Sequence, residues 1–133
     1  MSGKKLLLVD DDAVILKALA VKLQARGFEV VTARDGSTAV KAARTQRPDL
    51  ILLDLTFQPE FASVEWDGFR IMDWLKRIDE AADIPIVVIS GSDPAKFEAK
   101  AKAAGATAYF RKPVDHDALF AFIDQALSGA QAA

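Results

Sequence analysis

The chain has 133 residues, the size of one domain, and is 51% hydrophobic and 27% charged, as a globular protein with a buried core should be. With 17 basic and 19 acidic residues it lacks the basic excess of non-specific nucleic-acid binders, so we expect no direct nucleic-acid partner. Without cysteine it can form neither disulfides nor thiolate metal sites. No apolar run approaches the ~20 residues of a membrane span, and we expect no membrane segment and a cytoplasmic location.

Five short apolar runs, separated by helical patterns, predict β-strands. Four of the runs are almost continuously apolar, which is typical of parallel strands covered on both faces. The second run alternates partly between apolar and polar residues, and this pattern indicates a strand at the edge of the sheet. The predicted strands cover residues 5–10, 28–33, 50–54, 84–90 and 107–111.

The segments between these runs predict five helices. Gly27 should end the first helix, and the third should turn Ile71, Trp74, Leu75 and Ile78 inward. The regular alternation predicts an α/β fold, a doubly wound parallel sheet with helices on both faces in one domain, 1–133. The predicted helices cover about 13–26, 37–46 and 67–80, then run from Asp93-Pro94 to Gly105 and from Asp115 into 128–130.

Polar residues follow or end four of the predicted strands. Asp10 and Asp11 stand at the end of the first, Asp54 ends the third, Ser90 ends the fourth and Lys112 follows the fifth. In an open parallel sheet, ligands bind at this edge. Carboxylates that converge there repel one another unless a cation joins them, and all-oxygen ligands select Mg²⁺ or Mn²⁺. The hydroxyl and the ammonium group are suited to a phosphoryl group.

Taken in this order, the acidic pair, Asp54, Ser90-Gly91 and Lys112-Pro113 resemble the receiver domain of two-component response regulators over essentially the whole chain. The resemblance is to the chemotaxis-response-regulator-like form. It implies a flavodoxin-like (βα)₅ sandwich with a five-stranded sheet of order 2-1-3-4-5. It also implies phosphorelay signalling, in which a sensor histidine kinase or a histidine phosphotransfer domain phosphorylates Asp54. Such a chain is a regulatory phosphoacceptor that catalyses only its own phosphorylation and dephosphorylation, and not an enzyme in the usual sense.

The resemblance also implies a Mg²⁺ (or Mn²⁺) ligand set. Asp54 is then the phosphoacceptor. Asp11, Asp54 and the backbone carbonyl of Thr56 bind the metal directly, and Asp10 binds it through water. Asp12 is expected instead to cap the first helix.

Lys112 and Ser90 are implied to contact the phosphoryl oxygens. Tyr109 is implied to turn inward when Ser90 moves toward the phosphoryl group. This switch would alter the surface formed by the fourth helix, the fifth strand and the fifth helix. The chain would be a monomer or a phosphorylation-dependent dimer, and we expect no output domain within it. The single histidine, His116, is expected to face solvent without a role.

One segment departs from the family pattern. Residues 55–66 separate Asp54 from Asp67-Gly68, which is longer than usual in receivers. Four large apolar residues in this segment predict an ordered flap beside the site, and the predicted members are Phe57, Phe61, Val64 and Trp66.

Three alternatives remain open at the level of sequence. A phosphohydrolase with an aspartyl-phosphate intermediate usually needs a second acid two residues after the nucleophile, where this chain has Thr56. A flavodoxin-like cofactor binder needs a hydroxyl-rich phosphate loop after the first strand, where this chain has the acids 10–12. A degenerate receiver would bind partners without phosphorylation, and the complete set of acids, hydroxyl and lysine argues against it.

Overall fold

The chain is seen in a computed structural model, which describes residues 4–10, 12–54, 68–79, 81–90, 94–112 and 114–132. The predicted insertion, Asp11, Thr56, Gly91, Asp93 and Pro113 lie outside these ranges. Strands and helices alternate throughout the described part. The elements are β1 (Lys5–Val9), α1 (Ala13–Ala25), β2 (Glu29–Ala33), α2 (Gly36–Gln46), β3 (Leu50–Asp54), α3 (Gly68–Arg77), β4 (Ile86–Ser90), α4 (Pro94–Ala103), β5 (Ala108–Arg111) and α5 (His116–Ala132).

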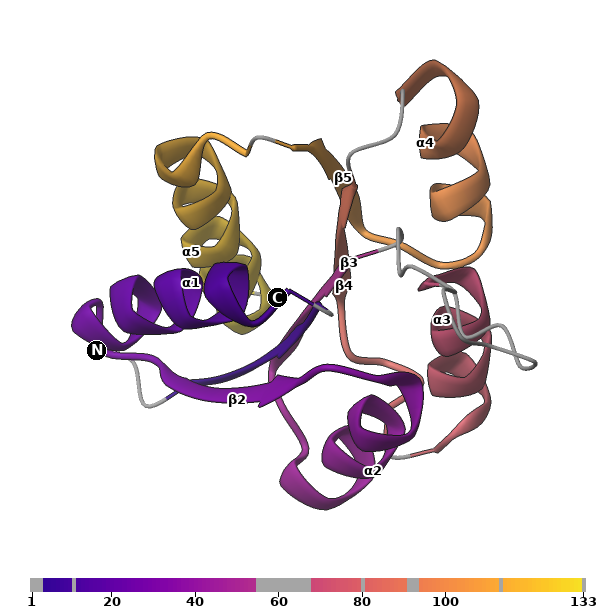
Figure 1. Cartoon of the computed structure of the whole chain (residues 1–133), viewed down its shortest axis with the longest axis horizontal. Helices are drawn as coiled ribbons and strands as arrows, with labels where there is room; N and C mark the ends of the chain where they lie inside the picture. Colours follow the sequence, from indigo (N-terminus) through magenta and orange to yellow (C-terminus); the bar gives the residue numbers. More distant parts are fainter. Residues whose placement is uncertain are drawn as a thin grey trace.

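All five described strands are parallel and form one sheet in the order β2-β1-β3-β4-β5. The predicted order is therefore confirmed, and β2 lies at an edge, as its alternating pattern indicated. Figure 1 shows the sheet between two layers, with α1 and α5 on one face and α2, α3 and α4 on the other. The register pairs Val9 with Leu53, and Ser90 with Arg111, so the strands that carry the predicted site residues end level with one another.

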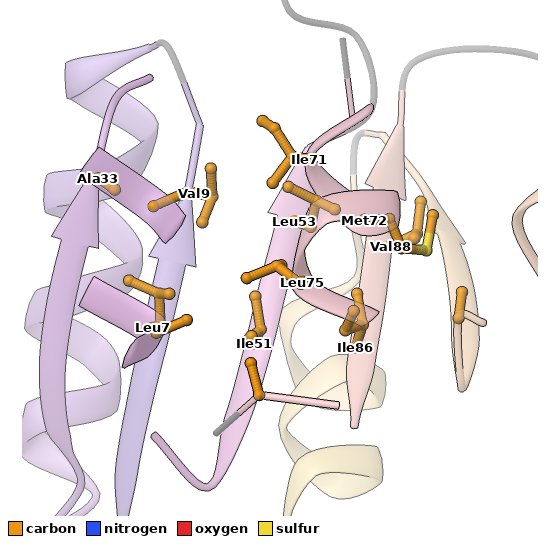
Figure 2. Close-up of a cluster of buried hydrophobic side chains, with 14 of the residues drawn as sticks. Leu7, Val9, Ala33, Ile51, Leu53, Ile71, Met72, Leu75, Ile86 and Val88 are labelled. Atoms are coloured by element: carbon orange, nitrogen blue, oxygen red, sulfur yellow. The ribbon is translucent and has the colours of Figure 1, made fainter. Parts of the chain in front are cut away.

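Successive strand residues point to opposite faces and build two apolar clusters, which confirms that the central strands are covered on both sides. Figure 2 shows the cluster between the sheet and α3. Its labelled members are Leu7, Val9, Ala33, Ile51, Leu53, Ile71, Met72, Leu75, Ile86 and Val88. The opposite cluster packs against α1 and α5. Its members are Leu6, Leu8, Leu16, Leu19, Leu23, Phe28, Leu50, Leu52, Val87, Ile89, Leu119, Phe120, Ile123 and Leu127.

The prediction for the inward face of α3 is wrong at one position. Trp74 is 48% exposed, whereas Ile71, Met72 and Leu75 are fully buried. At 100° per residue, the buried positions centre between Ile71 and Met72, so Trp74 lies roughly a quarter-turn or more away from that centre. The helix also ends earlier than predicted, at Arg77, and Ile78 is half-buried in the turn that follows.

Three of the predicted helix ends, at Asp12, Gly27 and Asp115, are confirmed. Asp12 caps α1, because its Oδ1 accepts hydrogen bonds from the backbone N–H groups of Val14 (2.9 Å) and Ile15 (3.3 Å). Gly27 follows α1 with a φ of 97°, a conformation that favours glycine. Asp115 caps α5 in the same way as Asp12 caps α1. In the described part of the chain, no helix is long and apolar enough to cross a membrane.

Candidate functional site

Three predicted site residues are buried at the carboxyl ends of adjacent strands. Asp10 follows β1 and is 6% exposed, Asp54 ends β3 and is 3% exposed, and Ser90 ends β4 and is fully buried. The backbone N–H of Asp10 donates to the carbonyl of Ala33, which continues the sheet pairing one residue past β1. Acids are seldom buried in this way unless charged partners compensate them.

The partner is Lys112, which follows β5. Its Nζ lies 3.2 Å from Asp10 Oδ2 and 3.3 Å from Asp54 Oδ2, so one ammonium group bridges two carboxylates. The backbone N–H of Lys112 also donates to the carbonyl of Ser90 at 2.8 Å, which fixes the start of the loop against β4. The structure thus brings together Asp10, Asp54, Ser90 and Lys112. The first and the last of these residues are 102 positions apart in the sequence.

Burial dominates the electrostatics of Asp10. Burial is the largest cause and the charge of Asp54 adds to it, and together they outweigh the lowering effects of the Asp12 N–H and of Lys112, so the pKa of this carboxyl is raised from its ordinary 3.8 to about 6. Burial alone would lower the pKa of Lys112, but the charges of Asp54 and Asp10 outweigh it, so the pKa of the ammonium is raised. The lysine therefore stays charged between the two acids.

The arrangement retains an excess of negative charge. Two carboxylates face one ammonium, and both are oxygen donors of the kind that Mg²⁺ prefers. Within the described residues, no three acids or histidines gather as a metal site, but Asp11 and Thr56 lie outside that part of the chain. The donor set that is described fits a small divalent cation in chemistry and in charge.

Tyr109 occupies β5, level with Val88, and is half-buried against the cluster on the α3 side of the sheet. Ser90 lies on the neighbouring strand, level with Arg111. The two predicted switch residues are therefore on adjacent strands, and Ser90 is the one of the two that lies at the acid-rich edge.

The structure also shows a hollow that the sequence did not predict. It has a volume of about 430 Å³ and opens between α1 and the start of α5, next to Asp10 and Lys112. Its other lining residues are Ile15, Leu19, Ile89, Val114 and His116. No periodicity in the sequence indicates it, because its walls come from four separate segments.

The expectation that His116 faces solvent is wrong. The residue is half-buried, its Nδ1 lies 2.9 Å from the Nζ of Lys22, and its ring stacks on Phe120 with centroids 5.6 Å apart. Lys22 belongs to α1, so His116 joins the start of α5 to α1. The contact spans 94 residues of sequence, and local pattern gave no sign of it.

Comparisons with known proteins agree with this fold. A model of the response regulator receiver domain matches residues 6–124. The transcriptional regulatory protein GlrR of Escherichia coli K12 is 34% identical over 122 residues, which are 92% of this chain and 26% of that protein. The chain thus spans about a quarter of the length of that relative. The polar-differentiation response regulator DivK of Brucella anthropi is 32% identical over 111 residues, 84% of this chain and 85% of DivK.

Solved structures give the same result. The chemotaxis protein CheY4 of Vibrio cholerae is similar in structure with a TM-score of 0.82, at 27% sequence identity. The similarity covers 93% of this chain and 98% of that one.

Proposed function

The chain belongs to the response regulator receiver domain family, and from this premise we propose that Asp54 accepts a phosphoryl group from a partner's phosphohistidine in a Mg²⁺-dependent step. Receiver domains of response regulators act in phosphorelay signalling and are phosphorylated by histidine kinases. The partner is therefore a sensor histidine kinase or a histidine phosphotransfer domain.

The observation that carries the proposal is the pair of buried carboxylates that share Lys112 at the carboxyl edge of the sheet. A carboxylate oxygen of Asp54 attacks phosphorus, an O–P bond forms, and the P–N bond to the donor imidazole breaks. The imidazole leaves with the electron pair of that bond and takes a proton from solvent. Water later attacks phosphorus, the O–P bond to Asp54 breaks, and the Asp54 carboxylate and inorganic phosphate are released.

The family binds Mg²⁺ in its active site. In this chain Asp11, Asp54 and the backbone carbonyl of Thr56 would hold the ion directly, and Asp10 would hold it through water, as the family resemblance implies. When bound, the ion offsets the negative charge on the phosphoryl oxygens, which is much of what phosphoryl transfer asks of a protein. The excess negative charge around Lys112 supports this assignment.

In this proposal Lys112 pairs with a different group before and after phosphoryl transfer. Before transfer, its ammonium group pairs with the Asp54 carboxylate at 3.3 Å. After transfer, the ammonium pairs with a phosphoryl oxygen in place of the carboxylate oxygen. Because the backbone N–H of Lys112 donates a hydrogen bond to the carbonyl of Ser90, a movement of Lys112 also moves the end of β4.

Ser90 and Tyr109 carry the conformational response. The Ser90 hydroxyl donates to a phosphoryl oxygen, and the ring of Tyr109 turns inward into the space that this movement leaves. The surface of α4, β5 and α5 then has two states, and the phosphoryl group favours one of them. The half-buried position of Tyr109, on the strand beside Ser90, supports this route.

Acetyl phosphate tests the central step. The protein is incubated with this donor and Mg²⁺, and its intact mass is measured. The wild type and Asp49→Ala, which alters the opposite end of β3, should gain one phosphoryl group. Asp54→Ala should gain none, and EDTA should prevent the reaction in every variant. Phosphorylation of Asp54→Ala at the wild-type level, or indifference to EDTA, would falsify the assignment.

A further inference from the structure

The hollow between α1 and α5 combines two kinds of surface. Its walls are aliphatic and come from Ile15 and Leu19 of α1, Ile89 of β4 and Val114 before α5. Its polar end is the Asp10–Lys112 pair, in which Asp10 is almost fully buried. A volume of about 430 Å³ lies within the range of sites that hold small molecules.

Contacts between α1 and α5 hold this hollow open. Lys22 meets His116 at 2.9 Å, and one turn further along α1 Arg26 lies over the ring of Phe120, 5.3 Å from its centroid. Arg26 also pairs with Asp124 one turn further along α5. This row of side chains joins α1 to α5 at two successive turns of each helix.

The charge at the polar end selects the ligand. Asp54 does not line the hollow, but its Oδ2 lies 3.3 Å from the Nζ of Lys112, so one ammonium group is shared by two carboxylates. A ligand with one positive charge would bring this set of three groups to neutrality. An anion would raise the excess to two negative charges, and a neutral ligand would leave it unchanged. Asp10 uses one oxygen for Lys112 and the other for the Asp12 N–H, at 3.2 Å and 2.9 Å, and each oxygen keeps a lone pair for a further donor.

We propose that this hollow binds a small amphiphilic cation, with an ammonium or amidinium group against Asp10 and an apolar body between Ile15, Leu19, Ile89 and Val114. The ligand sits beside the cation site of the proposed function. It therefore competes with Mg²⁺ for the charge of Asp10, and the same acid serves two ligands.

Benzylamine is a suitable probe, since it carries a primary ammonium on an apolar ring. We expect it to shift the amide and methyl NMR signals of Ile15, Leu19, Ile89 and Val114 in metal-free protein. Two matched probes separate the contributions: benzyl alcohol keeps the shape without the charge, and methylamine keeps the charge without the apolar body. Each should bind about tenfold more weakly, as the loss of one charged hydrogen bond or one buried apolar group predicts.

Two variants on neighbouring positions locate the site. Ile15→Gln places an amide in the wall of the hollow, whereas Val14→Gln alters the next residue, which is 77% exposed. The first should weaken benzylamine binding about fivefold or more, and the second should leave it unchanged. Val114→Thr, which keeps the shape of valine, gives the same comparison if Ile15→Gln does not fold.

Benzylamine binding is measured without metal or phosphodonor, so the result does not depend on whether Asp54 is phosphorylated. Added Mg²⁺ should raise the apparent dissociation constant of benzylamine. The inference is wrong if benzyl alcohol binds as tightly as benzylamine, if the shifted signals lie elsewhere, or if the Val14 and Ile15 variants behave alike. It is equally wrong if Mg²⁺ binds and leaves the affinity for benzylamine unchanged.

Discussion

The two ends of the sheet carry the same residue types in opposite circumstances. At the amino end, Lys5 pairs with Glu29 at 3.5 Å, and the side chains are 23% and 63% exposed. At the carboxyl end, the side chain of Lys112 is also 23% exposed, but the side chains of its partners Asp10 and Asp54 are only 8% and 3% exposed. The lysines are thus equally accessible, and the acids distinguish the two ends.

Because of this difference, water can hydrate the acid of the ion pair at the amino end, but it cannot hydrate the acids at the carboxyl end. The acid at the amino end keeps most of its hydration, so its pair with Lys5 adds little to stability. The acids at the carboxyl end have lost their water and depend on a cation. A site that requires a cation for its own stability is prepared to bind another cation or to place a cation against a phosphoryl group.

Removal of the lysine should have the largest effect and should separate the two ends most clearly. Lys112→Ala leaves two buried carboxylates without their shared cation and should lower the free energy of unfolding by about 3 kcal/mol in metal-free buffer at neutral pH. Lys5→Ala should lower it by less than about 1 kcal/mol, because its acid is exposed. Urea denaturation measures both values.

Addition of Mg²⁺ to the same urea denaturation experiments provides a second comparison. It should restore more stability to Lys112→Ala than to the wild type, since the acids of the variant bind the ion without competition from the ammonium group. Equal losses for the two lysine variants would remove the distinction between the ends. A large loss of Mg²⁺ affinity in Lys112→Ala would mean that Lys112 does not act on the phosphoryl side of the site.

The pH dependence of stability should come next in size. The pKa of Asp10 is raised from 3.8 to about 6 by burial, so the folded state holds its proton over a range in which the unfolded state has lost it. This contribution to stability is present in full below pH 3.8 and is lost as the pH rises to about 6. Relative to Asp10→Asn, the wild type should lose about 2 kcal/mol across that window in the presence of EDTA.

The comparison of slopes matters more here than the absolute stabilities, because Asp10→Asn also removes the ion pair with Lys112. Urea denaturation of both proteins at intervals between pH 4 and pH 7 gives the difference. Parallel curves for the two proteins would mean that Asp10 titrates in the folded chain as it does in the unfolded chain.

A substitution at Arg47, near the amino end of the sheet, should give a small gain in stability. Arg47 joins α2 to β3 with a φ of 48°, a left-handed conformation that costs a non-glycine residue free energy. Arg47→Gly should raise the free energy of unfolding by about 0.5 kcal/mol, net of the added flexibility of the unfolded chain. Arg44→Gly, inside α2, should instead lower it by about 1 kcal/mol. Losses of similar size in both variants would show that Arg47 makes contacts that outweigh its backbone strain.

Sequence pattern predicted much of this molecule because the relevant signals are local. Runs of five to seven residues identified the strands to within two residues, and Asp12 and Gly27 marked the ends of α1 through groups adjacent in the chain. The carboxyl-edge residues followed from one topological rule, since residues after parallel strands meet at one edge. The strand order came from the family resemblance and not from the alternation itself.

What the sequence did not predict depends on contacts between distant segments. Trp74 is a large apolar residue of the kind expected in a core, yet in the packing of α3 Met72 is buried and Trp74 is exposed. His116 meets Lys22 and closes one side of a hollow whose walls come from four segments. Neither the contact nor the hollow leaves a periodic signal in the chain. The prediction of an ordered flap concerns residues outside the described part and stays a prediction.

A Mg²⁺ titration followed by amide NMR signals tests most directly whether the buried acids form the cation site. Asp54 and Asp49 lie at or beside opposite ends of β3, so Asp54→Asn and Asp49→Asn form a matched pair. The wild type and Asp49→Asn should bind one ion with the same affinity, with shifts around residues 10, 54, 90 and 112. Asp54→Asn should bind at least about tenfold more weakly, as the loss of one charged ligand predicts. Equal affinities for the two variants, or shifts centred on Lys5 and Asp49, would contradict the assignment.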